Sequence, residues 1–362
     1  MVWDSGRVES DRTALVVPEG RLATRTWYTW QLELGDDTGG SQDAGAAWFE
    51  TALLDDHDRT GSWIHRIVDG DRAIDPPTFS TSSLATRRLL PAPHFRKPFA
   101  VDDPVIRARL YATARGLYVP FLNGARVGDH ELAPGWTDYN DRIMYQTSDV
   151  TDRITEGENV LSTVLSDGWW SGFVGSDRRE QGYHWGRYPQ AWAQLVVDYE
   201  DGSQRMTTCG GWRYADGAIR YSDLLMGEFV DARLDLGAWS APGYDDTGWT
   251  PAVVGTDDLT TLVAMPDEPI QAIEQLEARS ADSHGSVHVI DFGQNISGRF
   301  PIRIDEPKGP SSGSVTARSS TRVGSSTSRI CEPRRRPTGS SARASWRSSS
   351  RPSPRTASGT SR

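Results

Sequence analysis

Lysine, cysteine and long apolar runs are scarce in this sequence, and each shortage excludes a class of protein. Lys97 and Lys308 are the only lysines among 362 residues, and the formal net charge is -10. Such an acidic chain repels nucleic acid and anionic membranes, so neither is expected as a partner. The two cysteines, Cys209 and Cys331, lie in very different contexts, which argues against a disulfide framework. No stretch is apolar enough for a membrane span or a secretion signal, and we expect a soluble cytoplasmic protein.

Helical periodicity is also weak, whereas the alternation and turn residues of β-strands recur along the chain. Apolar residues alternate over 109–122 and stop at Asn123-Gly124, a pair that tolerates the positive φ angles of a tight hairpin turn. Runs at 143–147 and 160–165 predict a second strand pair, and 191–199 predicts a further strand. About eight such runs with even turn spacing are typical of a jelly-roll sandwich. No strand–helix–strand alternation is visible, so we predict an all-β fold.

Changes in composition divide the chain into five segments. The first contains short strands at 15–17, 26–34 and 47–51, the last two with alternating aromatics, which are too few for a complete sandwich. A strand at 287–292, paired as a hairpin with 299–304, predicts the start of another β domain. We predict a partial fibronectin type III-like sandwich (1–54), a linker (55–92), a central jelly-roll carbohydrate-binding-like domain (93–265), the beginning of a second β-sandwich (266–308) and a disordered Arg/Ser-rich tail (309–362).

The tail has a composition of its own. Its last 52 residues contain 17 Ser and 11 Arg, no Lys, and very few aliphatic side chains. Such a segment cannot bury enough apolar surface to offset the entropy of ordering it. One interpretation is a basic arm that binds polyanions. The other, which we favour because no aromatic or Lys patterning marks a nucleic-acid arm, is the out-of-frame translation of a GC-rich reading frame.

Two stretches have the residue types of a carbohydrate site. In such sites a flat aromatic ring lies under the apolar face of the sugar, while carboxylates and amides bind its hydroxyls. Trp170 and Trp185 are the aromatic candidates in the first stretch, with packing beneath their own loop as the alternative. Asp223, Glu228 and Asp231 are the carboxylate candidates in the second stretch.

The same three carboxylates, Asp223, Glu228 and Asp231, are candidates for a metal site. Carboxylates are hard oxygen ligands of the kind that Ca²⁺ prefers. No cofactor is required by the sequence, and Ca²⁺ is the one candidate. The alternative is an ion pair, of Asp231 with Arg233 or of Glu228 with an arginine, that fixes the loop.

Catalytic residues cannot be assigned from the sequence. Glycoside hydrolysis needs two carboxylates that face each other across a cleft, and sequence gives no pairwise distances among the many acids. The seven histidines show no metal-binding spacing on a helix, and no Gly-x-Ser-x-Gly motif is present.

A series of motifs in order identifies a resemblance. Leu122-Asn-Gly124, Leu132-Ala-Pro-Gly-Trp-Thr137, Gly157-Glu-Asn159, Asp167-Gly-Trp169 and Gly227-Glu-Phe-Val-Asp-Ala-Arg233 closely resemble the N-terminal β domain of α-L-rhamnosidases. Asp291-Phe-Gly-Gln-Asn295 looks like the opening of that family's next β domain. Trp3-Asp-Ser-Gly6, Tyr28-Thr-Trp30 and Trp48-Phe-Glu-Thr51 are similar to its leading fibronectin-type sandwich.

The resemblance covers residues 1–308 and implies a function. The family hydrolyses terminal α-L-rhamnosides with inversion, and its catalytic acids belong to an (α/α)6 barrel that nothing here resembles. Some members carry a calcium-assisted rhamnose site in the jelly-roll domain. We therefore expect the non-catalytic part of an α-L-rhamnosidase, truncated or frameshifted, that binds a rhamnose-containing glycan or glycoside at most. A weak glycosidase that uses β-domain carboxylates and a structural or adhesion module without sugar affinity are the alternatives.

Overall fold

The computed structural model describes residues 2–10, 14, 16–35, 40–67, 90–174, 183–207, 210–225, 227–255, 259, 261–284, 287–299, 314–318, 328–331 and 344–347. Strands dominate these residues, and the one α-helix among them, α1 (Gly168–Ser171), is a single turn. The predicted all-β class is confirmed. No helix in this part of the chain is long and apolar enough to cross a membrane.

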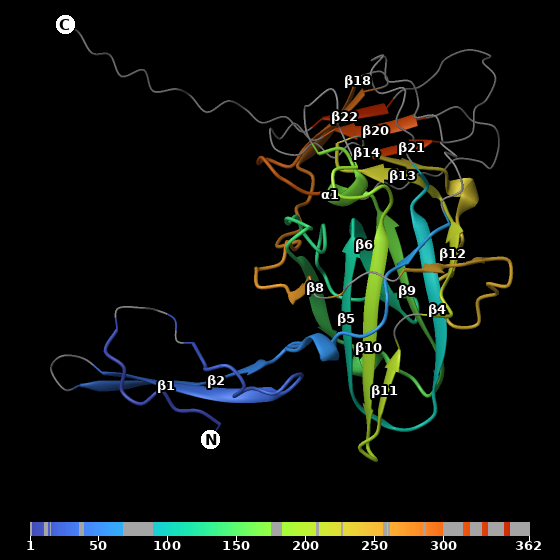
Figure 1. The fold of residues 1–362 in the computed structure, drawn as a ribbon. Helices are drawn as coiled ribbons and strands as arrows, with labels where there is room; N and C mark the ends of the chain where they lie inside the picture. Colours follow the sequence, from blue (N-terminus) through green and yellow to red (C-terminus); the bar gives the residue numbers. More distant parts are fainter. Residues whose placement is uncertain are drawn as a thin grey trace, which may run out of the picture.

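Two antiparallel sheets form a central sandwich (Figure 1). The seven-stranded sheet has the order β16 (Val253–Val254), β3 (Ile64–His65), β10 (Gln190–Tyr199), β5 (Val105–Arg115), β8 (Ile143–Asp149) and β17 (Leu262–Ala264), with β11 (Gln204–Thr207) beside β10. The six-stranded sheet has the order β15 (Thr250–Pro251), β12 (Arg213–Asp216), β4 (Pro93–Val101), β9 (Gly157–Ser166), β6 (Leu117–Leu122) and β7 (Ala125–Arg126). β17 is the exception to the antiparallel pattern, because it pairs with β8 in parallel.

The Asn-Gly turn lies where the sequence places it. Asn123 and Gly124 connect β6 to β7 and have φ angles of 52° and 84°. Asn123 also accepts a hydrogen bond from the backbone N–H of Val160 at 2.8 Å, which ties the turn to β9. The hairpin prediction is confirmed.

The predicted second strand pair is wrong in its partners. Both strands exist, as β8 and β9, but β8 pairs with β5 and β9 pairs with β4 and β6, so they lie in opposite sheets. The short 3-10 helix η2 (Thr151–Arg153) stands between them in the chain. A connection of this kind crosses from one layer of the sandwich to the other, as jelly rolls do.

The seven-stranded sheet is buried on both faces. Its inner face packs against the six-stranded sheet through side chains such as Leu110 of β5 and Leu195 of β10. Its outer face carries Tyr111 and Trp192, which are covered by a second apolar cluster from the loops. This two-sided burial explains why β10 reads as a nearly continuous apolar run.

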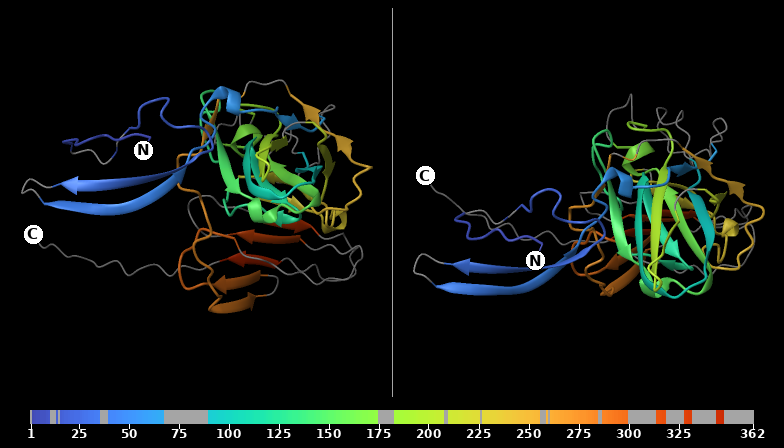
Figure 2. Two further views of the ribbon diagram at one scale, coloured as in Figure 1. Left: turned by 90° about the horizontal axis from the view of Figure 1, so that it is seen from below. Right: turned by 60° about the horizontal axis from the view of Figure 1, so that its bottom comes forward.

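A separate hairpin leads into the sandwich. β1 (Trp27–Gly35) and β2 (Ser41–Glu50) pair only with each other among the described strands, and they project away from the sandwich in Figures 1 and 2. The strand expected at 15–17 is not observed, because Val16 and Val17 lie in no strand; Leu15 lies outside the described residues. The 3-10 helix η1 (Asp56–Asp58) follows the hairpin.

A third sheet lies at the opposite end of the sandwich. Its order is β13 (Ile219–Asp223), β14 (Gly227–Val230), β21 (Ser328–Cys331), β20 (Ser314–Arg318), β22 (Ala344–Arg347), β19 (Val287–Asp291) and β18 (Ser280–His284). β19 pairs with β18 and β22. The sequence suggested a hairpin with 299–304, of which residues 300–304 lie outside the described part. Residues 309–362 are predicted to be disordered. In the structure this segment contains the three short strands β20, β21 and β22, and its remaining residues are outside the described part.

Candidate functional site

Aromatic side chains gather over the outer face of the seven-stranded sheet. They come from α1 and two loops and are Trp136, Tyr139, Trp169, Trp170 and Trp185; we call them the aromatic surface. Tyr139 is its centre, because its ring meets the edges or faces of Trp170 and Trp185 at centroid distances of 5.3 and 5.2 Å. Burial raises the pKa of the Tyr139 hydroxyl well above its usual value, so this ring stays neutral.

Trp170, a sequence-predicted ligand contact, is held inside the aromatic surface. The Arg115 guanidinium lies 5.1 Å from one Trp170 ring and 4.4 Å from Trp63, which places the cation between two indoles. The Trp170 indole N–H donates to the Tyr188 carbonyl at 3.1 Å. A Cβ at Gly186 would come within 2.2 Å of the Trp170 Nε1 atom, so glycine is required there. The structure supports loop packing for Trp170, the alternative that the sequence left open.

Trp136 is the most exposed member and was missed as a ligand candidate. Its side chain is 61% exposed, and its ring is parallel to that of Trp169, with 6.3 Å between centroids and 4° between planes. Exposed Asp138 and Asn140 follow in the same loop, and the Asp138 carboxylate accepts from the backbone N–H and the side-chain amide of Asn140 at 3.0 and 3.1 Å. The loop thus offers a flat apolar ring, a carboxylate and an amide, the groups that sugars bind.

Trp185 is the other aromatic residue that the sequence predicts. It is half-buried, packs on Tyr139, and meets the His184 ring at 5.9 Å. The structure therefore brings Trp170 and Trp185 together around Tyr139. Trp185 lies at the border of the described residues, because 175–182 are outside them.

Asp223 belongs to a structural contact between the two predicted stretches. It is 6% exposed, and its carboxylate accepts from the backbone N–H groups of Phe173 and Leu225 at 2.8 and 2.9 Å. Phe173 lies two residues after α1, next to its C-cap residue Gly172, so Asp223 joins the end of the Asp167–Gly172 segment to the β13–β14 turn. The carboxylate is thereby engaged in holding the fold.

The remaining carboxylates do not join Asp223 in a metal site. Asp231 caps η3 (Ala232–Leu234) and pairs with Arg233 at 2.5 Å, the ion pair that the sequence offered as an alternative. These hydrogen bonds from Arg233 lower the pKa of Asp231. Glu228 on β14 is half-buried, and desolvation raises its pKa. Among the described residues, no three His, Cys, Asp or Glu side chains gather closely enough to hold a metal ion.

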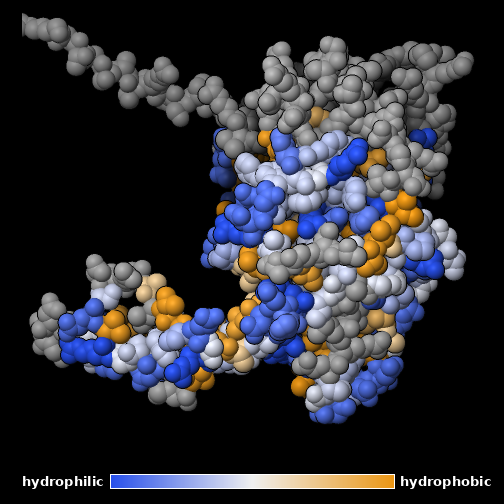
Figure 3. Space-filling view, viewed as in Figure 1, coloured by the Kyte–Doolittle hydropathy of each residue, from blue (hydrophilic) through white to orange (hydrophobic). Residues whose placement is uncertain are grey.

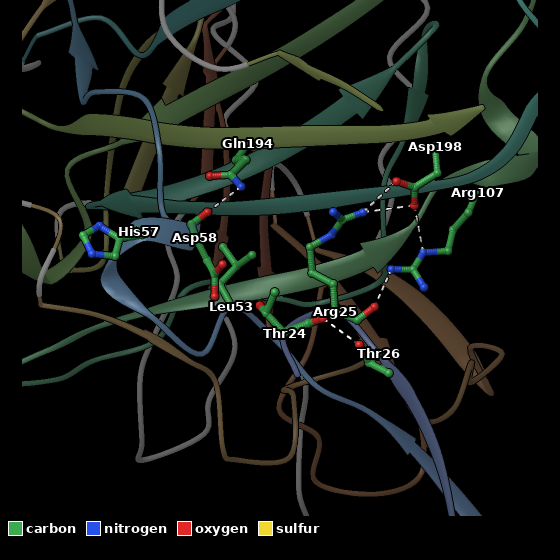
Figure 4. A pocket seen from close by; sticks show the side chains of 9 residues that line it. All are labelled: Thr24, Arg25, Thr26, Leu53, His57, Asp58, Arg107, Gln194 and Asp198. Carbon is green, nitrogen blue, oxygen red and sulfur yellow. Dashed lines mark hydrogen bonds and ion pairs between the residues drawn. The ribbon is translucent and has the colours of Figure 1, made fainter. Parts of the chain in front are cut away.

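A cavity of about 510 Å³ lies at the root of the β1–β2 hairpin (Figure 4). Arg25 donates to both oxygens of Asp198 at 3.1 and 3.0 Å, and Arg107 Nε lies 3.2 Å from the same carboxylate. Gln194 donates to the Asp58 carbonyl at 2.9 Å. These polar groups come from both sides of the cavity and bond one another. The cavity therefore lies where the hairpin is attached to the sandwich.

Comparison with known proteins follows the same division of the chain. Residues 103–274 match the α-L-rhamnosidase N-terminal domain, and residues 1–55 match the Rha78A-like N-terminal immunoglobulin domain. This chain belongs to the α-L-rhamnosidase family, as an N-terminal region of it. The match at 1–55 refines the predicted fibronectin-type sandwich to an immunoglobulin-type one, an architecture that the two folds share.

Individual relatives agree with this assignment. An α-L-rhamnosidase of Streptomyces avermitilis is 44% identical over 219 residues, 59% of this chain and 21% of the relative. One from Alteromonas sp. is 32% identical over 314 residues, 85% of this chain and 33% of the relative. The chain thus spans a fifth to a third of these rhamnosidases. The crystal structure of the Streptomyces avermitilis enzyme complexed with L-rhamnose has the same fold, with a TM-score of 0.72 at 24% identity over 95% of this chain and 49% of that chain.

Proposed function

We propose that this chain is the carbohydrate-recognising, non-catalytic part of an α-L-rhamnosidase and that its aromatic surface binds a terminal L-rhamnose unit. The observation that carries the proposal is the exposed Trp136 ring, parallel to that of Trp169, in the same loop as the exposed Asp138 and Asn140. Membership of the rhamnosidase family supports rhamnose as the sugar. The sugar's apolar face lies on Trp136, and its hydroxyls bond the neighbouring carboxylate and amide.

The non-catalytic part of the proposal is supported by how the acids of the sandwich are used. Asp223 and Asp231, which the sequence suggested for a site, accept hydrogen bonds that hold turns and caps. Glu228 is the acid that favours the alternative of weak glycosidase activity. Desolvation raises its pKa, and a raised pKa is what a general acid needs.

Calorimetric titration with L-rhamnose tests the binding. The wild-type chain should bind, and Trp136→Ala should weaken binding about fivefold or more, because truncating an aromatic contact costs about 1 kcal/mol or more. Trp48→Ala is the matched control: Trp48 is 62% exposed but lies on the hairpin, so its loss should leave binding unchanged. No heat with the wild-type chain would contradict the proposal and favour a structural module without sugar affinity.

Two further measurements separate the alternatives. Titrations with Ca²⁺ and with a chelator test the calcium hypothesis; a rise in affinity with Ca²⁺ that Glu228→Gln removes would support it. Hydrolysis of a chromogenic aryl α-L-rhamnoside should not exceed the blank. A rate above the blank that Glu228→Gln abolishes would replace the non-catalytic proposal with the weak-glycosidase one.

A further inference from the structure

Arg115 is the last residue of β5 and lies next to the aromatic surface. Its Cα partner across the sheet is Gln190 of β10, and its Nη1 atom donates to the side-chain oxygen of Gln190 at 2.7 Å. Because side chains alternate along a strand, Arg115 shares the outer face of the sheet with Tyr111. The sheet register and this hydrogen bond together fix where the guanidinium lies.

The guanidinium of Arg115 contacts two indole rings from different parts of the chain. It lies 4.4 Å from the ring of Trp63, which is fully buried, and 5.1 Å from the ring of Trp170, which is half-buried. A planar guanidinium over an aromatic ring restrains the plane of that ring. The hydrogen bond from the Trp170 indole N–H to Tyr188 fixes only one atom of the ring. Arg115 therefore adds a restraint that the hydrogen bond does not supply.

Two routes connect Trp170 to the exposed Trp136. The Trp170 ring meets Tyr139 at 5.3 Å, and the Tyr139 hydroxyl donates at 3.4 Å to the carbonyl of Gly135, one residue before Trp136. Trp169 precedes Trp170 in α1, and its ring is parallel to that of Trp136. The surface near α1 carries both hydrophilic and hydrophobic residues (Figure 3), so the exposed ring depends on specific contacts such as these for its position.

We propose that Arg115 is a positioning residue of the aromatic surface: it holds Trp170 and, through Tyr139 and α1, keeps the Trp136 ring in place to receive a sugar. Arg115 acts through its neighbours and not by contact with the sugar. The sugar-binding consequence rests on the proposed function, whereas the positioning of Trp136 can be measured without a ligand. A merely structural Arg115 would change the stability of the sandwich but not the surroundings of Trp136.

Fluorine NMR of the full chain labelled with 5-fluorotryptophan tests the positioning. Trp136→Phe and Trp170→Phe assign the two resonances by their loss. Arg115→Met keeps the length of the side chain but removes the cation, so both resonances should shift and that of Trp136 should change in width. Arg107→Met is the matched control, because it removes a half-buried arginine from the same strand at the hairpin root, and it should leave both resonances in place. An unchanged Trp136 resonance in Arg115→Met would overturn the proposal.

Calorimetric titration with L-rhamnose tests the consequence for binding. Arg115→Met should weaken binding about threefold or more, and Arg115→Lys, which restores the charge without the planar stack, should recover part of the loss. Arg107→Met should bind like the wild type. Equal losses of affinity in Arg107→Met and Arg115→Met would indicate general destabilisation and overturn the positioning role. No heat with the wild-type chain would contradict the proposed function, and the fluorine spectra would still decide the role of Arg115.

Discussion

The sandwich and the hairpin use the same kinds of residue in opposite ways. Trp192 on β10 is 1% exposed and packs with Tyr111 and Tyr145 on the outer face of its sheet, whereas Trp48 on β2 is 62% exposed. Ion pairs differ as well. In the sandwich they are secondary to a continuous apolar core, while at the hairpin root they form the connection itself, through Glu50 and Asp198. Buried apolar side chains stabilise the sandwich, whereas ion pairs attach the hairpin to it.

Truncating one tryptophan in each region should give the largest contrast. Trp192→Ala should lower the free energy of unfolding of the sandwich by about 3–5 kcal/mol, because it opens a cavity among packed side chains. Trp48→Ala should change it by less than about 0.5 kcal/mol. Urea denaturation followed by circular dichroism measures both. Equal losses in the two variants would mean that hairpin and sandwich unfold as one unit.

A buried histidine should make the sandwich sensitive to acid. Burial lowers the pKa of His94 from 6.5 to about 4, so the folded state binds the proton only near pH 4 while the unfolded chain binds it near pH 6.5. The stability that neutral His94 contributes is fully present above pH 6.5 and is lost as the pH falls towards 4. The expected loss is about 3 kcal/mol.

Urea denaturation at a series of pH values measures this loss. His94→Gln should flatten the dependence between pH 6.5 and 4, because the side chain no longer titrates. His57→Gln, at an exposed position of η1, is the control and should keep the wild-type slope. If His94→Gln and the wild type have the same slope, the neutral state of His94 is not what limits acid stability.

The smallest effect should come from loosening the hairpin at its root. Arg109 Nε and Nη2 donate to the Glu50 carboxylate at 3.1 and 2.9 Å, and Arg109 also pairs with Asp149 at 2.8 Å. Glu50→Gln removes one charge but leaves Arg109 paired, so we expect a local cost of about 1 kcal/mol. Hydrogen exchange should speed up in 41–50 and stay constant in 190–199. Glu33→Gln, away from the root, should change neither, and faster exchange in 190–199 would contradict a local effect.

Local signals in the sequence predicted the elements well. The positive φ angles of Asn123 and Gly124 follow from the residues themselves, and the apolar run of β10 needs no partner to be recognised. Pairing was not predictable in the same way. Whether β8 meets β9 or β5 depends on how η2 carries the chain between layers, which no local pattern encodes.

The candidate site shows the same limit. The structure brings the predicted Trp170 and Trp185 together around Tyr139, but which aromatic residues are exposed depends on distant neighbours. Trp170 is half-buried and lies against Arg115 of β5, whereas Trp136 is 61% exposed in the described part of the chain. The Pro134-Gly-Trp136 turn was a signal in the sequence, but it indicated only local geometry. Asp223 was singled out for its charge, and its partner Phe173 could not be inferred from spacing.

Strand β5 also fixes the distance between the hairpin and the aromatic surface. Arg107 and Arg109 near its beginning anchor the hairpin, and Arg115 at its end is stacked against Trp170 of the aromatic surface. Eight residues of extended strand separate Arg107 from Arg115, a span of about 26 Å. Since β5 is paired on both sides, this spacing is stiff. The root of the hairpin and the aromatic surface are therefore held at a fixed distance and direction from each other.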